Sequence, residues 1–324
     1  MKKYISLMAI AIVAIFSSCS NDDITIGAPS VVNINASSVI SSFVEYNEGE
    51  LEVASSGYSI RIRGLVYNTR GELVADETGY FSNYNQSLSL KSYLSPGTYT
   101  VIGISDVVAK SGSSVETEFW TVSGEAKLAE MQIVDQKKVG YEARVLGLAK
   151  GTLTVQGSQS NSLTLDLKPA GSLIYAFVMN REAFSGRDIS SYNVYANKTS
   201  DAIKFDANGN YTITERQEDG IIYKLFGFES GTGGVYGLNY ILPMKNVEVW
   251  FTANEDGKNK TFPTDNRATL NISAGEEYEF DLYLDTNIYN IETAYSQVDL
   301  SSASSRYFEW AKSWNDRIQV VRNK

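Results

Sequence analysis

Short segments in which apolar and polar residues alternate recur along the chain, and they limit its fold more than any other feature. In residues 278–284, for example, Tyr278, Phe280 and Leu282 alternate with acidic residues. This is the period of a β-strand with one buried face. The pattern returns at 58–63, 163–167, 173–177 and 247–251. We therefore predict a mostly all-β protein in which antiparallel sheets pack as sandwiches.

Turn-forming residues separate these segments. Gly, Asn and Asp tolerate the positive φ that tight hairpins require, and Pro interrupts strand pairing. Such residues gather at 68–71, 96–97, 206–210, 254–257 and 274–275. Their spacing predicts hairpins between neighbouring strands.

Helical spacing is rare. Near the C-terminus an i, i+3, i+4, i+7 pattern is formed by Tyr307, Trp310, Ala311, Trp314 and Ile318. It predicts a short amphipathic helix, which we expect to pack on its own domain, with a surface for a partner as the alternative. A second and weaker helical candidate covers residues 126–131.

The chain has no His and a single Cys, which excludes several kinds of site. Without His there is no Ser/His/Asp or Cys/His nucleophile, and one Cys forms neither an internal disulfide nor a Cys-ligated zinc site. We therefore expect no enzyme activity, no cofactor and no metal, and we assign no catalytic residue.

Two weaker alternatives stay open. A glycoside hydrolase would need two carboxylates at a set separation, but a chain with 38 Asp and Glu residues contains such pairs by chance. Oxygens at Asp206, Asn208 and Asn210 alternate as in a calcium loop, but the later Glu of an EF-hand is missing. A hairpin turn explains this segment more simply.

The N-terminus has the layout of an export signal. Lys2 and Lys3 precede an apolar stretch from Ile5 to Phe16, which is shorter than the roughly 20 residues that span a bilayer. Small residues then lead to Cys19. This layout resembles a bacterial lipoprotein signal, in which residues 1–18 are removed and Cys19 is acylated, for example with palmitate. Residues 19–30 would then form a lipidated linker.

The linker begins with Ser20, Asn21, Asp22 and Asp23. An acidic pair at this place resembles the signal that exports Bacteroidetes lipoproteins to the outer face of the outer membrane, and a solvated linker is the alternative. Cleavage before Cys19 removes two Lys and no acid, so the net charge changes from −10 to about −12. An acidic surface argues against nucleic acid and against anionic lipid as partners.

The chain is longer than one sandwich usually requires, which suggests two domains. Lys168-Pro169-Ala170-Gly171 interrupts pairing between two alternating segments. We place the boundary there, with sandwiches over 31–168 and 169–324.

Two further segments add to the lipoprotein signal. These are Val66-Tyr67-Asn68-Thr69-Arg70-Gly71-Glu72-Leu73-Val74 and Leu94-Ser95-Pro96-Gly97-Thr98-Tyr99-Thr100-Val101. Together with the length, they resemble the fimbrillin-like surface lipoproteins of Bacteroidetes. The resemblance implies two tandem transthyretin-like β-sandwiches, a lipid anchor in the cell outer membrane, and assembly with other fimbrial subunits into adhesive pili.

Assembly in this family resembles strand addition, in which a subunit that lacks a strand accepts one from its neighbour. A trypsin-like protease opens the groove of stalk subunits, which requires a basic residue in an early loop. Here no Lys or Arg lies between Lys3 and Arg61, and Arg61 and Arg63 lie inside an alternating segment. Arg70 is the first exposed candidate for processing, and a cut there would remove more than one strand.

This departure favours a subunit that keeps its lipid, such as an anchor or accessory component. Anchors of this group tend to carry a further Cys, which is missing here, so the subunit role stays open. The segments that could be donated or replaced are Val32, Ile34 and Ala36 near the N-terminus and Ile318, Val320 and Val321 near the C-terminus. Pairing within their own domain is the alternative.

A different function is also open, that of a surface glycan-binding lipoprotein. Exposed aromatic rings stack on the apolar faces of sugars, and amides and carboxylates bind the hydroxyls. The candidate platforms are Tyr80, Phe81 and Tyr84, or Tyr236 and Tyr240. Partners would then include glycans or proteins of host or bacterial surfaces.

Overall fold

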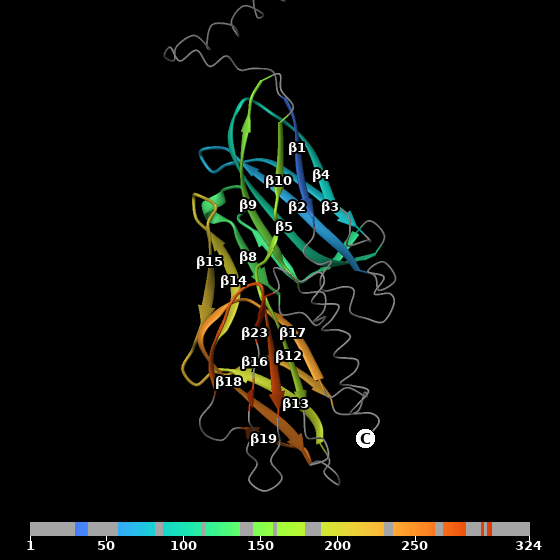
Figure 1. Cartoon of the computed structure of the whole chain (residues 1–324), viewed down its shortest axis with the longest axis vertical. Helices are drawn as coiled ribbons and strands as arrows, with labels where there is room; N and C mark the ends of the chain where they lie inside the picture. Colours follow the sequence, from blue (N-terminus) through green and yellow to red (C-terminus); the bar gives the residue numbers. More distant parts are fainter. Residues whose placement is uncertain are drawn as a thin grey trace, which may run out of the picture.

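The computed structural model describes residues 30–37, 58–81, 87–111, 114–136, 145–157, 161–178, 189–229, 236–262, 268–282, 293–294 and 297–299. Strands dominate these ranges, which confirms the all-β fold (Figure 1). At the weaker helical candidate, the structure has a single 3₁₀ turn, η1 (Leu128–Glu130). Within the described ranges, no helix has the length and apolar character needed to cross a bilayer. The predicted C-terminal helix lies outside them.

Three sheets build the upper part of the molecule. The N-terminal sheet has the order β10 (Asn161–Leu165), β1 (Ser30–Ser37), β4 (Ser87–Leu94). The central sheet has the order β11 (Lys168–Pro169), β9 (Gly147–Val155), β5 (Gly97–Ser111), β2 (Tyr58–Tyr67), β3 (Leu73–Phe81), with β6 (Ser114–Glu118) beside β5. The bridging sheet has the order β15 (Tyr211–Arg216), β14 (Thr199–Phe205), β8 (Gln132–Asp135), β7 (Trp120–Ser123).

The central sheet is the middle layer. On one side, the position of a Cβ at Gly103 would lie 2.8 Å from Leu165 of the N-terminal sheet. On the other side, the turn of the bridging sheet at Gly209 lies against Thr100 and Ile102. Both faces of the central sheet are therefore covered, which explains why successive residues 101–108 of β5 are all buried.

Two sheets build the lower part. One contains β17 (Tyr236–Ile241), β12 (Ser172–Val178), β21 (Glu276–Leu282), β22 (Thr293–Ala294) and β23 (Gln297–Asp299). The other contains β16 (Tyr223–Glu229), β13 (Ile189–Ala196), β18 (Met244–Glu255), β19 (Lys258–Phe262) and β20 (Ala268–Ile272). Their apolar side chains form a second core, separate from that of the upper part.

The two parts repeat one topology. β1 lies between antiparallel β4 and parallel β10, and β12 lies between antiparallel β17 and parallel β21. Each first strand is thus inserted between two strands that come later in its own half. This agrees with the expectation of two related sandwiches in series.

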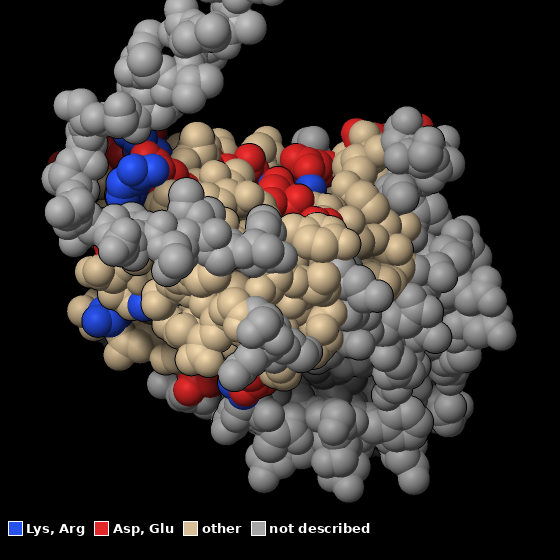
Figure 2. Space-filling model, turned by 90° about the horizontal axis from the view of Figure 1, so that it is seen from above, with Lys and Arg blue, Asp and Glu red and all other residues tan. Residues whose placement is uncertain are grey.

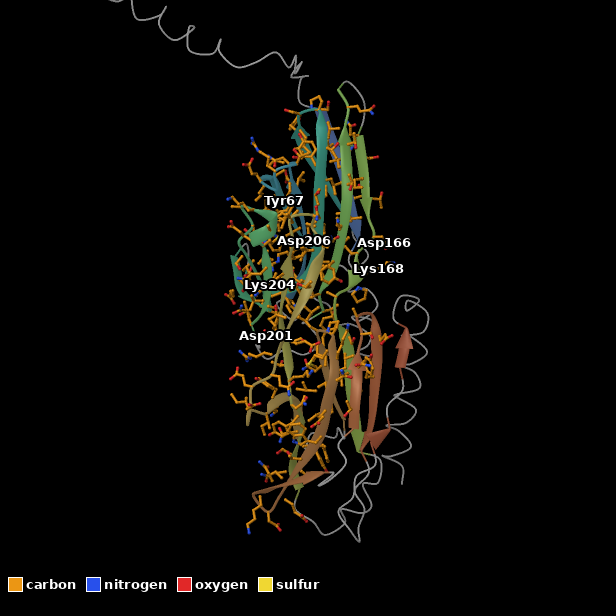
Figure 3. The ribbon with its side chains drawn as sticks, turned by 90° about the vertical axis from the view of Figure 1, so that its left-hand side faces the viewer. Tyr67, Asp166, Lys168, Asp201, Lys204 and Asp206 are labelled. Carbon is orange, nitrogen blue, oxygen red and sulfur yellow. The ribbon has the colours of Figure 1, made fainter. Side chains whose placement is uncertain are left out.

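Contacts connect the segments on the two sides of the boundary predicted at 168–171. β14 and β15 follow the boundary in sequence, yet β14 pairs with β8 of the upper part at Ala202–Lys204. Figure 3 shows Asp166 and Lys168, an ion pair with 2.8 Å between its charged atoms, at the level where the two parts meet. On the other side of the molecule, Asp201 and Lys204 of β14 lie near this level.

Candidate functional site

β1 occupies a groove between two strands. It pairs antiparallel with β4 over eight residue pairs, from Ser30 with Leu94 to Ser37 with Ser87. It pairs parallel with β10 over five residue pairs, from Val32 with Asn161 to Ala36 with Leu165. β1 is therefore the central strand of its sheet although it is the first described segment of the chain.

The inner face of β1 is apolar and buried. Val32, Ile34 and Ala36, the N-terminal candidates for exchange, have exposed fractions of 0%, 1% and 3%. Burial of one Val or Ile side chain stabilises a fold by roughly 1.5–3 kcal/mol. A chain without β1 would expose this apolar groove together with one unpaired edge on β4 and one on β10, which is the surface that strand addition needs.

One wall of the groove, β10, packs directly against the central sheet. At Gly151 of β9 a Cβ would lie 2.8 Å from both Leu163 and Leu165 of β10, and at Gly103 of β5 it would lie 2.8 Å from Leu165. The two glycines leave room for these leucines on the central sheet. β10 therefore has an anchorage that does not depend on β1.

Arg70, the candidate for processing, lies in the turn between β2 and β3. Its side chain is 76% exposed and pairs with Glu72 at 2.7 Å. The oxygen of the Asn68 side chain accepts hydrogen bonds from the backbone N–H groups of Arg70 (2.9 Å) and Glu72 (3.0 Å). Gly71 supplies the positive φ of 72° that closes the turn. The predicted turn is confirmed, and it is tightly hydrogen-bonded.

A second segment supports this turn. The N–H of Leu73 donates to the carbonyl of Ala126 (3.1 Å), and the N–H of Leu128 donates to that of Gly71 (2.8 Å). Hydrogen bonds from the side chains of Asn68 and Arg70 lower the pKa of the Glu72 carboxyl. A protease that needs several extended residues in its active site would first have to open these bonds.

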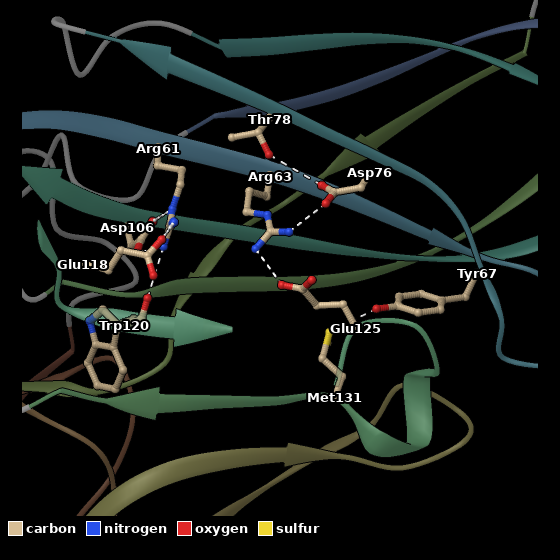
Figure 4. A network of polar contacts seen from close by, with 10 residues as sticks. All are labelled: Arg61, Arg63, Tyr67, Asp76, Thr78, Asp106, Glu118, Trp120, Glu125 and Met131. Carbon is tan, nitrogen blue, oxygen red and sulfur yellow. Dashed lines mark hydrogen bonds and ion pairs between the residues drawn. The ribbon is translucent and has the colours of Figure 1, made fainter. Parts of the chain in front are cut away.

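Residues 118–131 are in turn held by buried charges (Figure 4). Arg61 of β2 is only 4% exposed. Its guanidinium donates to both carboxylate oxygens of Asp106 on β5, at 2.8 and 2.7 Å, and to the carbonyl of Trp120 at 3.1 Å. It also pairs with Glu118. Burial acts to lower the pKa of Arg61, but the two carboxylates outweigh it and the pKa is raised.

Arg63 forms a parallel cluster one step along β2. It pairs with Asp76 of β3 at 2.8 Å and with Glu125 at 3.1 Å. Beyond it, the hydroxyl of Tyr67 lies 3.1 Å from the sulfur of Met131. The polar face predicted for this strand therefore lies mostly inside the protein, where it attaches residues 118–131 to the central sheet.

The structure corrects one aromatic residue of the glycan alternative. Tyr240 has an exposed fraction of 0%, and its hydroxyl is used inside the protein, so it cannot stack on a sugar. Tyr80 is 41% exposed, whereas Phe81 packs against the upper core. Tyr84 and the side chain of Tyr236 lie outside the described part of the chain.

Sequence reasoning missed the most exposed aromatic of the described surface. Tyr93 on β4 is 74% exposed and stands opposite Val31 of β1, which is 42% exposed. The signal was present, because Tyr93 alternates with the inward Ser92 and Leu94. However, alternation alone does not tell which of two faces is solvated.

The segment at 206–210 is a hairpin turn, as predicted. One oxygen of the Asp206 carboxylate accepts the N–H groups of Asn208 (2.9 Å) and Asn210 (2.8 Å), and the other accepts the Asn210 side-chain amide (3.1 Å). Both oxygens of Asp206 are thus engaged within the turn. Cys19, Ser20–Asp23 and Ile318–Val321 lie outside the described residues, so their predicted roles are untested.

Comparisons with known proteins give solved structures at low sequence identity and no sequence family. No protein-family model matches the chain, and no curated protein matches it. A candidate cell adhesion protein from Bacteroides ovatus has 13% identity, with 84% of this chain and 98% of that chain covered and a TM-score of 0.47. The tip fimbrial protein Mfa3 from Porphyromonas gingivalis has 10% identity, with coverage of 83% and 99% and a TM-score of 0.42. At such values no function follows for this chain.

Proposed function

We propose that the protein is a lipid-anchored subunit of cell-surface fimbriae that works in adhesion and keeps its own first strand. The observation that carries the proposal is β1, the N-terminal strand between β4 and β10, which follows a lipoprotein-like signal and a short linker. The linker from Cys19 to Ser30 reaches at most about 40 Å when extended. The seated strand thus connects the acylated residue to the fold.

Retention of β1 is supported by the chain around it. The first basic residue after Lys3 is the buried Arg61, and the exposed Arg70 lies in a tightly bonded turn. A cut at Arg70 would also release β2, which lies between β5 and β3 in the central sheet. A subunit that cannot lose β1 alone keeps its groove filled, as an anchor or accessory component would.

The mass of the mature protein tests this proposal. We expect protein purified from outer membranes to begin at Cys19 with acyl chains, and to incorporate a palmitate analogue that the Cys19→Ala variant does not incorporate. A mature chain that begins at Gly71, or label that persists in Cys19→Ala, would contradict it. Arg70→Gln serves as a control, because its mature mass should differ only by the substitution.

Assembly by strand addition has its own test. Strand-exchanged polymers dissociate slowly, so outer-membrane samples kept cool in detergent should show complexes with other subunits that boiling removes. With β1 retained, the remaining candidate segment for donation is the alternating sequence at Ile318, Val320 and Val321, and deletion of residues 317–324 should abolish the complexes. A single monomer band in both samples, or complexes that survive the deletion, would refute the assembly role.

Tyr93 favours glycan binding as a second candidate function. Beside the Val31–Tyr93 pair, the register aligns Asn33 with Ser162 and Asn35 with Thr164 on the outer face of the N-terminal sheet. Ser162 and Thr164 are exposed. Figure 2 looks onto the end of the molecule, where charged residues lie mostly toward the rim of the described surface and uncharged residues cover most of the rest. An aromatic ring next to rows of amides and hydroxyls suits a neutral glycan.

This second candidate is tested with beads coated with mannan, arabinoxylan, galactan or a β-1,3-glucan. We expect at least one to retain the protein, Tyr93→Ala to abolish retention, and Tyr80→Ala on β3 to leave it unchanged. Failure of all four polysaccharides, or equal retention by Tyr93→Ala, would refute a site at Tyr93.

A further inference from the structure

The upper core contains residues of the C-terminal half. Four residues of that half belong to the same apolar cluster as Val32 and Ile34 of β1: Ile203 and Phe205 of β14, Tyr240 of β17, and Leu242 just after β17. We propose that this docked part of the C-terminal half is a latch that holds β1 in its groove. The latch itself is a feature of the fold. Its importance for assembly rests on the proposed function, in which β1 stays in its groove.

Tyr240 is the central contact of the latch. Its hydroxyl donates to the carbonyl of Leu146 (2.8 Å) and accepts the N–H of Gly171 (2.5 Å). Its ring meets that of Trp120 edge-on, with 6.4 Å between ring centroids and 89° between the planes. One side chain from the lower part therefore contacts Leu146 just before β9, Gly171 of the boundary segment, and Trp120 of β7 in the bridging sheet.

The boundary segment has no freedom at this contact. A Cβ at Gly171 would lie 2.4 Å from the carbonyl oxygen of Ile241 and 2.7 Å from the ring of Tyr240. The N–H of Ala170 donates to the carbonyl of Leu146 (2.8 Å), and the N–H of Gly275 donates to that of Gly171 (2.9 Å). The connection between the halves is packed into both of them and does not act as a loose linker.

The β14–β15 hairpin forms the second contact. Ile203, which is fully buried, pairs with Ile133 of β8, and the Gly209 turn reaches Ile102 of β5. The next residue of β5, Gly103, faces Leu165 of β10, which borders β1. A single strand thus separates the hairpin from the wall of the β1 groove.

This arrangement predicts coupled opening. Ile102 of β5 and Leu165 of β10 belong to the same packed cluster as the latch residues. Proteins open locally in such contiguous cooperative units, and we expect this cluster to open as one of them. Weakening of the latch should therefore increase how often β1 leaves its groove, even though no latch residue touches β1 directly in the hydrogen-bond register.

Hydrogen exchange of the full chain tests the latch. Tyr240→Phe removes one hydroxyl, leaves the buried N–H of Gly171 without its acceptor, and should make β1 amides exchange about tenfold faster. Tyr278→Phe is the matched control. Tyr278 is also fully buried, and its hydroxyl bonds Ser273 (2.9 Å) and Asn271 (3.0 Å), but it lies in the lower core. It should leave β1 exchange unchanged.

A milder variant guards against misfolding. Ile203→Val removes one methylene group from the hairpin contact and should accelerate β1 exchange in the same direction by a smaller factor. Equal acceleration by Tyr278→Phe would show general destabilisation and overturn the latch. Unchanged β1 exchange in both Tyr240→Phe and Ile203→Val would also overturn it.

A second readout separates the latch from strand exchange at the β1 groove. A labelled peptide of residues 29–37 should bind Tyr240→Phe faster than the unaltered chain. Faster β1 exchange without peptide binding would support the latch and argue against strand exchange at this groove. Peptide binding at equal rates in both proteins would support exchange and overturn the latch.

Discussion

At the residue scale, Arg61 shows that a sequence pattern can place a side chain on the right face of a strand without telling whether that face is exposed. Alternation places Arg61 on the polar face of β2, and in the structure it lies on the same face of the central sheet as its cross-strand partner Asp106. That face is nevertheless covered by β7, so the guanidinium and the Asp106 carboxylate are both buried. Burial raises the pKa of Asp106, although the guanidinium beside it acts to lower that pKa. Two buried charges are acceptable here because each satisfies the other.

Removal of Arg61 should therefore be costly. Arg61→Met leaves the Asp106 carboxylate buried without a cation, and we expect the free energy of unfolding to fall by about 3–5 kcal/mol, measured by urea denaturation. Arg70→Met, which breaks an exposed pair, should cause no measurable change. A loss below about 1 kcal/mol for Arg61→Met would contradict this account, and Arg61→Met/Asp106→Leu should recover most of the loss.

At the scale of elements, the hairpins follow from local chemistry. The turns at 68–71 and 206–210 were both predictable because Asn and Asp side chains bond the backbone two to four residues on, and Gly supplies a positive φ. Which strands pair with one another was not predictable from the sequence. The parallel insertion of β1 beside β10 pairs segments more than 100 residues apart, for which no local signal exists.

The Asp206 turn should respond to acid. The hydrogen bond from the Asn210 backbone is the largest of the effects that lower the pKa of Asp206. Because the folded pKa is depressed, the turn is fully stabilised above the unfolded value, and this stabilisation is lost as the pH falls through the folded value. The NMR shifts of the Asn208 and Asn210 amides should titrate with a midpoint below 3.8. A midpoint at or above 3.8, or the same titration in Asp206→Asn, would refute this.

At the scale of the whole molecule, the two halves share the upper core. Ile203, Phe205 and Tyr240 reach into it from beyond the predicted boundary, so the described parts are two sandwiches in topology but are joined in packing. The sequence places the boundary at Pro169 and Gly171, but in the structure Pro169 still pairs with Gly147 of β9, and β12 begins at Ser172, directly after Gly171. The crossing hairpin could not be foreseen, because a strand pattern does not name its partner sheet.

We therefore expect the halves to unfold together. Calorimetry of the mature chain should show one transition with a calorimetric to van't Hoff enthalpy ratio near one. Limited proteolysis near the midpoint provides the independent check, since it should release no stable fragment of residues 31–168. Two resolved transitions, or such a fragment, would contradict a shared core.

The sequence by itself determined the strand-rich class, the hairpin turns at 68–71, 206–210 and 254–257, and the absence of His-based chemistry, because these depend on residue type and on periods of two to five residues. The turns at 96–97 and 274–275, also predicted as hairpins, instead connect strands of different sheets. Tertiary structure decided that β1 lies between β4 and β10, that Arg61 and Tyr240 are buried, and that Tyr93 is exposed. Alternation says that a strand has two different faces. Only the packing of whole sheets decides which of them meets water.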